Sequence, residues 1–273
     1  MTTSEQIHQC ATSIREKLND DIPDVAVILG SGLGDFVNAM NIEDQIPYDQ
    51  ISHFPKPGVS GHAGTLLKGT INGRSILCLQ GRVHSYEGQE PKYMTTPLRA
   101  LKLAGIKTLV ITSAVGSLRE SMPPGSLMMV TDHINMSGVS PLAGPNDDAF
   151  GVRFPDMTEA YPVANREILI EAAKAADITL HEGVFCMVRG PHFETPAEIR
   201  AFQILGADVV GMSMVPEVIL ANHCGLNVAA VAMVTNLGAG MTEGRLTHDE
   251  TLSEGAKAAG NMAKLLGEFL PKV

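Results

Sequence analysis

Short apolar runs alternate with amphipathic stretches along most of this chain. Runs that are apolar throughout are typical of strands buried on both faces, and helices spaced between such strands predict an α/β fold with a mainly parallel sheet. The expected strands are residues 25–30, 107–116, 125–135, 183–190, 207–213 and 227–236. The expected helices are residues 4–19, 97–106, 165–178, 196–205, 215–226 and 247–270.

Two further segments complete the predicted organisation. Residues 65–82 contain Asn72-Gly73 between two strand-like runs, which predicts a β-hairpin and therefore a mixed sheet. Residues 137–162 are rich in Gly, Pro, Asn and Asp, which indicates a long loop of the kind that often carries function. Without a linker or an internal repeat, residues 1–273 are expected to form one α/β domain, with a central mixed, largely parallel sheet flanked by helices.

Charge and composition narrow the classes of partner and compartment. The 273 residues are 44% hydrophobic and 18% charged, so a sizeable core is expected. The net charge of −10 argues against nucleic acid or an anionic membrane as a partner. No apolar run reaches membrane-spanning length and no signal peptide is visible, so a cytoplasmic protein is expected. Buried free thiols are the expected state of the scattered cysteines Cys10, Cys78, Cys186 and Cys224.

A glycine-rich turn follows the first expected strand, as Gly-Ser-Gly-Leu-Gly at residues 30–34. The dinucleotide fingerprint requires a further glycine at the position of Asp35, and the Walker A motif requires Gly-Lys-Ser/Thr, so neither motif is present. The turn can still present backbone N–H groups and the Ser31 hydroxyl to a phosphate. A tight strand-to-helix turn without a ligand explains it equally well.

Small residues, three of them polar, stand where several expected strands end. In open α/β sheets, ligands bind beyond the carboxyl ends of the strands, so these positions are expected to meet on one rim. Taken singly, each residue could be no more than a cap. The four positions are Ser31, Ala114, Ser213 and Asn236.

Residues 81–88, Gly-Arg-Val-His-Ser-Tyr-Glu-Gly, follow the second strand of the predicted hairpin. Arg82 and His84 are two residues apart, so both point to one face if the strand continues, where they would suit an oxyanion. A solvated strand end is the alternative. His62, a histidine after a glycine, is on this evidence alone more often structural.

The helix expected at 196–205 needs one glutamate, yet two lie at its start. Thr195 fits the N-cap and Glu198 the third helical position, which together form a capping box. Glu194, beside Phe193, is left without a role in the helix. Elsewhere no spacing fits a metal-ligand set and no Gly-x-Ser-x-Gly elbow occurs, so a serine hydrolase is disfavoured.

Six motifs, taken in order and spacing, resemble the trimeric purine nucleoside phosphorylases, and especially their bacterial members. They are VILGSGLGDF, GHAGTL, GRVHSYEG, GPHFETPAEIR, VVGMSMVPEV and VTNLGAGM followed by LTH, and the resemblance runs from about residue 25 to residue 250. The resemblance implies phosphorolysis of purine (deoxy)ribonucleosides, with inosine and guanosine preferred, to the free base and (deoxy)ribose 1-phosphate in purine salvage. It implies no metal or other cofactor, since catalysis is mostly positioning and electrostatic stabilisation; inorganic phosphate is a co-substrate.

The resemblance also assigns residues. The implied phosphate-binding set is Ser31, His62, Arg82, His84, Ala114 and Ser213. The implied nucleoside-binding set is Tyr86, Phe154, Phe193, Glu194, Met212, Asn236 and His248. The implied catalytic residues are His84, Asn236, Glu194 and His62. Phe154 would reach a neighbouring subunit's site in a homotrimer, and trimers pairing into hexamers is left open.

The chain departs from the family's pattern at Ser113, Val115, Phe185, His192 and Leu237, which bears on base specificity. Two alternatives remain at this point. A methylthioadenosine phosphorylase on the same fold is expected to have aspartate at the position of Asn236 and an apolar residue at that of His248. A non-catalytic nucleoside- or phosphate-binding protein is the other.

Overall fold

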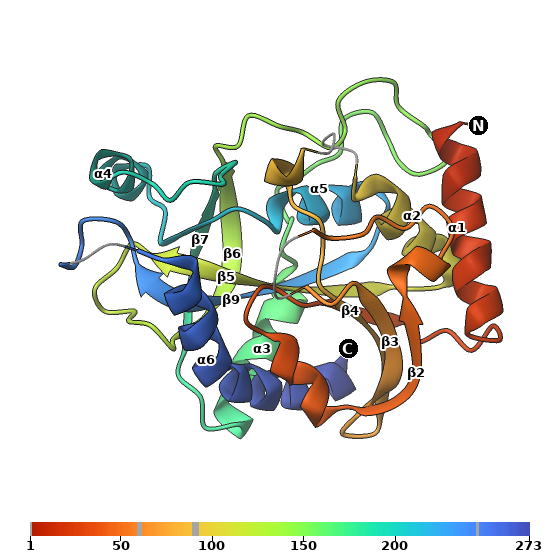
Figure 1. The fold of residues 1–273 in the computed structure, drawn as a ribbon, viewed down its shortest axis with the longest axis horizontal. Helices are drawn as coiled ribbons and strands as arrows, with labels where there is room; N and C mark the ends of the chain where they lie inside the picture. Colours follow the sequence, from red (N-terminus) through yellow and green to blue (C-terminus); the bar gives the residue numbers. More distant parts are fainter. Residues whose placement is uncertain (1, 59–61, 89–92, 244–245) are drawn as a thin grey trace.

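The computed structural model describes residues 2–58, 62–88, 93–243 and 246–273, apart from the side chains of residues 248–250, 252 and 257. Figure 1 shows a central sheet with helices on both sides. Its strands are β1 Val25–Ile28, β2 Asn41–Pro47, β3 Thr65–Ile71, β4 Arg74–Gln80, β5 Thr108–Ser117, β6 Leu127–Asn135, β7 Leu180–Met187, β8 Val209–Gly211 and β9 Asn227–Leu237. Its α-helices are α1 Thr3–Lys17, α2 Thr95–Ala104, α3 Val163–Ala175, α4 Pro196–Ile204, α5 Val215–His223 and α6 His248–Phe269.

The described strands form one sheet in the order β2-β3-β4-β1-β5-β8-β7-β6-β9, and β9 also pairs with β5. The strands β5, β8, β7, β6 and β9 therefore close into a ring. Pairing is parallel for β1 with β4 and β5, for β5 with β9, and for β7 with β6 and β8. Four further described pairs are antiparallel, so the predicted mixed sheet is confirmed.

The predicted hairpin is confirmed as β3 and β4. Asn72 and Gly73 have φ values of 48° and 79°, the left-handed conformations that a two-residue hairpin turn requires. Strand β2, which pairs antiparallel with β3, was not predicted. Its sequence is mostly polar and only Ile46 is fully buried, so it lacks the apolar alternation of a strand packed on a core.

The described helices cover both faces of the sheet and pack on two large cores and, at α4, on a smaller third one. Helices α1, α2 and α5 lie on one side, where Ile7, Leu98 and Val218 belong to the larger core. Helices α3 and α6 lie on the other, where Leu169 and Leu265 belong to the second core (Figure 1). All four cysteines are buried as free thiols, as expected. Among the described residues, no helix is both long and apolar enough to span a membrane.

The predicted long loop is confirmed between β6 and α3, and a buried arginine–histidine pair holds it. The Arg99 guanidinium of α2 lies 4.7 Å from the ring centre of Phe150, and its Nη2 donates to His223 Nδ1 of α5 at 3.4 Å. Since Nδ1 accepts, the proton of a neutral His223 is on Nε2, which donates to Asn146 Oδ1 at 3.2 Å. Two helices thus fix the loop segment around residues 146–151.

Candidate active site

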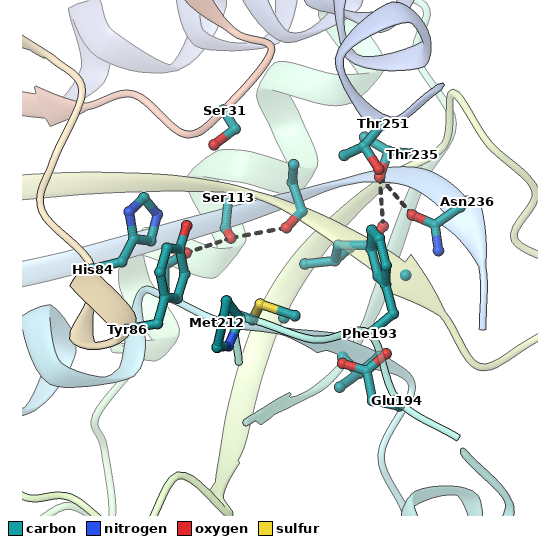
Figure 2. Close-up of a pocket in the computed structure, with 17 residues that line it drawn as sticks. Ser31, His84, Tyr86, Ser113, Phe193, Glu194, Met212, Thr235, Asn236 and Thr251 are labelled. Atoms are coloured by element: carbon teal, nitrogen blue, oxygen red, sulfur yellow. Dashed lines mark hydrogen bonds between the residues drawn. The ribbon is translucent and has the colours of Figure 1, made fainter. Parts of the chain in front are cut away.

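A cavity of about 280 Å³ opens at the ends of the strands that form the ring (Figure 2). The four strand-end positions predicted to meet on one rim all line it. It is lined by Ser31, His84, Tyr86, Ser113, Ala114, Val115, Gly116, Pro191, Phe193, Glu194, Val210, Gly211, Met212, Ser213, Thr235, Asn236 and Thr251. Nine of these were assigned to the site from the sequence: Ser31, His84, Tyr86, Ala114, Phe193, Glu194, Met212, Ser213 and Asn236.

The glycine-rich turn after β1 packs tightly against β5. The Gly30 N–H donates to Thr112 Oγ1 at 3.0 Å, and a Cβ on Gly30 would lie 2.8 Å from the Cα of Ser113. Glycine is therefore needed at this position for the turn to approach β5. The close approach places the Ser31 hydroxyl on the cavity wall.

His62 lies behind Ser31, in contact with it, rather than on the cavity wall. The backbone N–H of Arg82 donates to His62 Nδ1 at 2.9 Å, and His62 Nε2 is 2.9 Å from Ser31 Oγ. A neutral His62 whose Nδ1 accepts carries its proton on Nε2, so it donates to Ser31. The Ser31 hydroxyl then keeps its own proton for an acceptor in the cavity.

Glu87 and Tyr86 hold the His84 ring in place. Glu87 Oε1 accepts from the backbone N–H of His84 at 2.7 Å and lies 3.1 Å from Nδ1 of the same residue. The His84 ring stacks on Tyr86 with centroids 4.8 Å apart and meets the edge of His62 at 5.0 Å. The carboxylate directs Nδ1–H away from the cavity, which leaves Nε2 at the other side of the ring.

Strand β4 does not continue to Arg82 and His84, so the condition under which the two side chains were expected to share one face is not met. Strand β4 ends at Gln80, and Gly81 turns the chain with φ of 105°, which breaks the alternation on which the expectation depended. The Arg82 side chain is fully buried: Nη1 donates to Glu217 Oε1 at 3.2 Å and Nη2 to the carbonyl of Thr112. In this conformation it does not line the cavity.

The glutamate left over from the capping box does line the cavity. Glu198 Oε2 accepts from the Thr195 N–H at 2.8 Å, and Thr195 Oγ1 accepts from the Glu198 N–H at 3.3 Å, so the predicted box is confirmed. Glu194 takes no part in it and faces the cavity beside Phe193 (Figure 2). Burial raises the pKa of the Glu194 carboxyl above its ordinary value.

Asn236 lies at the cavity next to a shift in the register with which β9 pairs with β5. Val115 pairs with Val234 and the next residue, Gly116, with Asn236, so Thr235 is one residue extra in β9. Thr235 Oγ1 donates to Asn236 Oδ1 at 2.9 Å, and Asn236 Nδ2 donates to the Leu237 carbonyl at 3.0 Å. A Cβ on Gly116 would come within 3.0 Å of Nδ2, so this glycine leaves room for the amide.

Phe154, assigned to the nucleoside from the sequence, does not line the cavity of its own chain. Phe154 is on the long loop, 86% exposed, with the Arg153 guanidinium 5.6 Å from its ring centre. The side chain of His248, the first residue of α6, is outside the described part of the chain. Conversely, Thr235 and Thr251 line the cavity without having been predicted. Thr235 could have been found as the neighbour of Asn236 at a strand end, whereas a threonine inside a helix such as Thr251 gives no signal.

Hydroxyl and imidazole groups lie at one end of the cavity, and an amide, a carboxylate and two threonine hydroxyls lie at the other (Figure 2). Hydroxyl and imidazole donors gather at one end, where Ser31, His84 and Ser113 lie. An amide and a carboxylate lie at the other end with Phe193 and can hydrogen-bond a flat heterocycle. Met212 lies between the two ends, and Tyr86 stacks on His84 at the first. This cavity, at the strand ends of an α/β fold, has the groups that can hold an anion at one end and a flat heterocycle at the other, as an enzyme for such a substrate requires.

Comparison with known proteins places the chain in a family. A model described as "Phosphorylase superfamily" matches residues 24–271. Purine nucleoside phosphorylase 1 of Geobacillus stearothermophilus is 42% identical over 260 residues, which cover 95% of this chain and 94% of that protein. The chain therefore belongs to the phosphorylase superfamily and, within it, to the purine nucleoside phosphorylases. Its activity is that of a pentosyltransferase which phosphorolyses purine nucleosides.

Solved structures agree with this assignment. Purine nucleoside phosphorylase of Schistosoma mansoni in complex with adenosine superposes with a TM-score of 0.93 at 37% identity, covering 100% of this chain and 99% of that one. The complex of the same organism's enzyme with inosine gives a TM-score of 0.91 at 36% identity, covering 100% and 98%. The predicted fold class and family resemblance are thereby confirmed.

Proposed function

We propose that this phosphorylase prefers 6-oxopurine nucleosides, and that Glu194 is the group that selects them. The observation that carries the proposal is a half-buried carboxylate that lines the cavity and takes no part in the adjoining capping box. A carboxylate only accepts hydrogen bonds. It therefore matches the N1–H of inosine and guanosine and the 2-amino group of guanosine, whereas adenosine presents a lone pair at N1.

In the proposed arrangement, phosphate occupies the end of the cavity where Ser31, His84, the Ala114 N–H and Ser213 lie, and the base occupies the end with Asn236. A phosphate oxygen bonds to the anomeric carbon while the glycosidic bond breaks, and its electron pair passes to the purine. Asn236 donates to N7 as negative charge builds there, an interaction stronger in the transition state than in the ground state. Positioning and electrostatics supply the catalysis, with phosphate as co-substrate and no metal or other cofactor.

Arg82 and His62 have indirect roles in this proposal. His62 directs the Ser31 proton towards phosphate. Arg82 contributes its positive charge from behind the cavity wall, or reaches phosphate after leaving Glu217. Tyr86 and Met212 flank the pentose, with His248 assigned to its 5′ side.

We also propose a cytoplasmic homotrimer in which Phe154 completes the neighbouring subunit's site. The exposed phenyl ring on a loop that its own helices hold in place supports this, because the ring is outside its own cavity. Buried free thiols suit the reducing cytoplasm. The net charge of −10 favours small-molecule substrates over nucleic acid or membrane.

Methylthioadenosine phosphorolysis is the competing activity, and Asn236 argues against it. A panel of inosine, guanosine, adenosine and methylthioadenosine, each with and without phosphate, tests both assignments by chromatography of the released base. Inosine and guanosine should be cleaved only with phosphate, and adenosine poorly; a site that requires an N1–H donor discriminates by up to roughly 10⁴. Equal cleavage of adenosine and inosine would remove the role of Glu194, and base release without phosphate would indicate hydrolysis.

A further inference from the structure

Two serine hydroxyls meet at the phosphate end of the cavity, although they are a hundred residues apart in sequence. Ser113 Oγ of β5 and Ser213 Oγ, after β8, are 2.8 Å apart. Ser113 is 1% exposed and Ser213 is 8% exposed, and both line the cavity. Ser113 was noted from the sequence as a departure from the family's pattern, without any role of its own.

The two hydroxyls carry only two protons, so the pair can donate only two hydrogen bonds at a time. Each hydroxyl donates one proton and accepts through two lone pairs. Ser113 Oγ also lies 3.2 Å from the carbonyl of Ala114, to which it donates. In the ligand-free arrangement the chain of donation therefore runs from Ser213 to Ser113 to the Ala114 carbonyl.

A bound phosphate changes that direction. The charged oxygens of the anion only accept, so Ser213 turns its proton to one of them, and its own oxygen is then left to accept from Ser113. Ser113 gives up the Ala114 carbonyl and donates to Ser213. A hydroxyl that accepts one hydrogen bond donates more strongly in another, and the low dielectric of the site strengthens both.

We propose that Ser113 is a positioning residue for phosphate: it orients the Ser213 hydroxyl and strengthens it as a donor without itself binding the anion. The inference rests on the proposed phosphate site. It makes Ser113 and Ser213 one functional unit, so their contributions to phosphate binding are coupled. Removing Ser113 should weaken phosphate binding through Ser213 alone.

A double-mutant cycle measures this coupling, with KM for phosphate and KM for inosine determined separately. Ser213→Ala should raise KM for phosphate by roughly 10- to 100-fold, as expected for a hydrogen bond to a charged group. Ser113→Ala should raise it by roughly 3- to 10-fold and leave KM for inosine unchanged. The double variant should match Ser213→Ala rather than multiply the two effects.

Ser117→Ala is the matched control, since Ser117 is a fully buried serine on the same strand whose hydroxyl bonds only the backbone of Arg119 among the described contacts. It should lower the melting temperature and leave KM for phosphate unchanged. Ser113→Cys, which keeps a weak donor, should fall between wild type and Ser113→Ala.

Three results would overturn the inference: a multiplied effect in the double variant, a changed KM for inosine in Ser113→Ala, or a lower melting temperature with no change in KM for phosphate. If Ser213→Ala itself leaves KM for phosphate unchanged, the fault lies in the proposed phosphate site instead. A failure of the role given to Ser113 can therefore be distinguished from a failure of the proposed phosphate site.

Discussion

Glu194 and Glu198 are four residues apart and do different work. Glu198 closes the capping box of α4, whereas Glu194 faces the cavity. This division was predictable from the sequence, because a capping box fixes which glutamate the helix uses. The same local logic failed for Arg82 and His84, because the end of β4 and the turn at Gly81 depend on packing that two residues of spacing do not reveal.

Replacing each glutamate by alanine should separate binding from stability. Glu194→Ala should lose most activity on inosine and guanosine, because the N1–H loses its acceptor. Glu198→Ala should lower the melting temperature slightly by removing half of the capping box and should leave kcat/KM for inosine unchanged. Steady-state kinetics and thermal melts of both variants provide the measurement, and an inosine defect confined to Glu198→Ala would contradict the assignment.

Arg82 carries a second residue-scale prediction, because its partner Glu217 is only 1% exposed. Arg82→Ala leaves a buried carboxylate without its counter-charge, which should cost about 3–5 kcal/mol of unfolding free energy. Adding Glu217→Gln should restore much of that loss without restoring phosphate affinity. Denaturant unfolding and the KM for phosphate distinguish the two effects; full stability in Arg82→Ala would show that the pair contributes little.

At the scale of elements, strand and helix positions were largely predictable and two features were not. The buried strands are continuous apolar runs, so β5 and β9 were found within a residue or so at either end. Strand β2 was missed because an edge strand needs no apolar face. The extra residue Thr235 in β9 was missed because its position depends on pairing with a strand over a hundred residues away.

The long loop should respond to pH through His223. Burial lowers the pKa of His223, and the nearby Arg99 guanidinium lowers it further. As the pH falls, His223 is therefore protonated more readily in the unfolded chain than in the folded chain. The free energy of unfolding should fall as pH drops below about 6.5. Burial also lowers the pKa of His133 and His181, so His223→Gln should reduce the slope without abolishing it.

Chemical denaturation of wild type and His223→Gln between about pH 7 and pH 5 checks this expectation. An identical slope in the two proteins would show that His223 is protonated as readily in the folded chain as in the unfolded one. A fall in stability towards high pH instead would reverse the sign of the argument.

At the scale of the whole molecule, the proposed trimer predicts complementation between subunits. Phe154→Ala should keep its fold and assembly but bind nucleoside roughly 10- to 100-fold more weakly, because a buried phenyl contact is lost. Mixed with the inactive Glu194→Ala protein after reversible dissociation, it should regain activity, since an intact site can then borrow Phe154 from its neighbour. Light scattering confirms the assembly state; no gain on mixing, or a fully active monomer, would refute the shared site.

The closed strand ring has a consequence for the newly made chain. Strand β5 lies along β1 on one side, and its other partners, β8 and β9, are synthesised far later: Thr108 pairs with Asn227. Until the ribosome has added the intervening residues, the apolar strand β5 has one edge without its partner strands. Unpaired strand edges of this kind favour aggregation. A nascent chain that ends before Asn236 lacks part of the cavity wall, so the cavity is complete only after nearly the whole chain has been made.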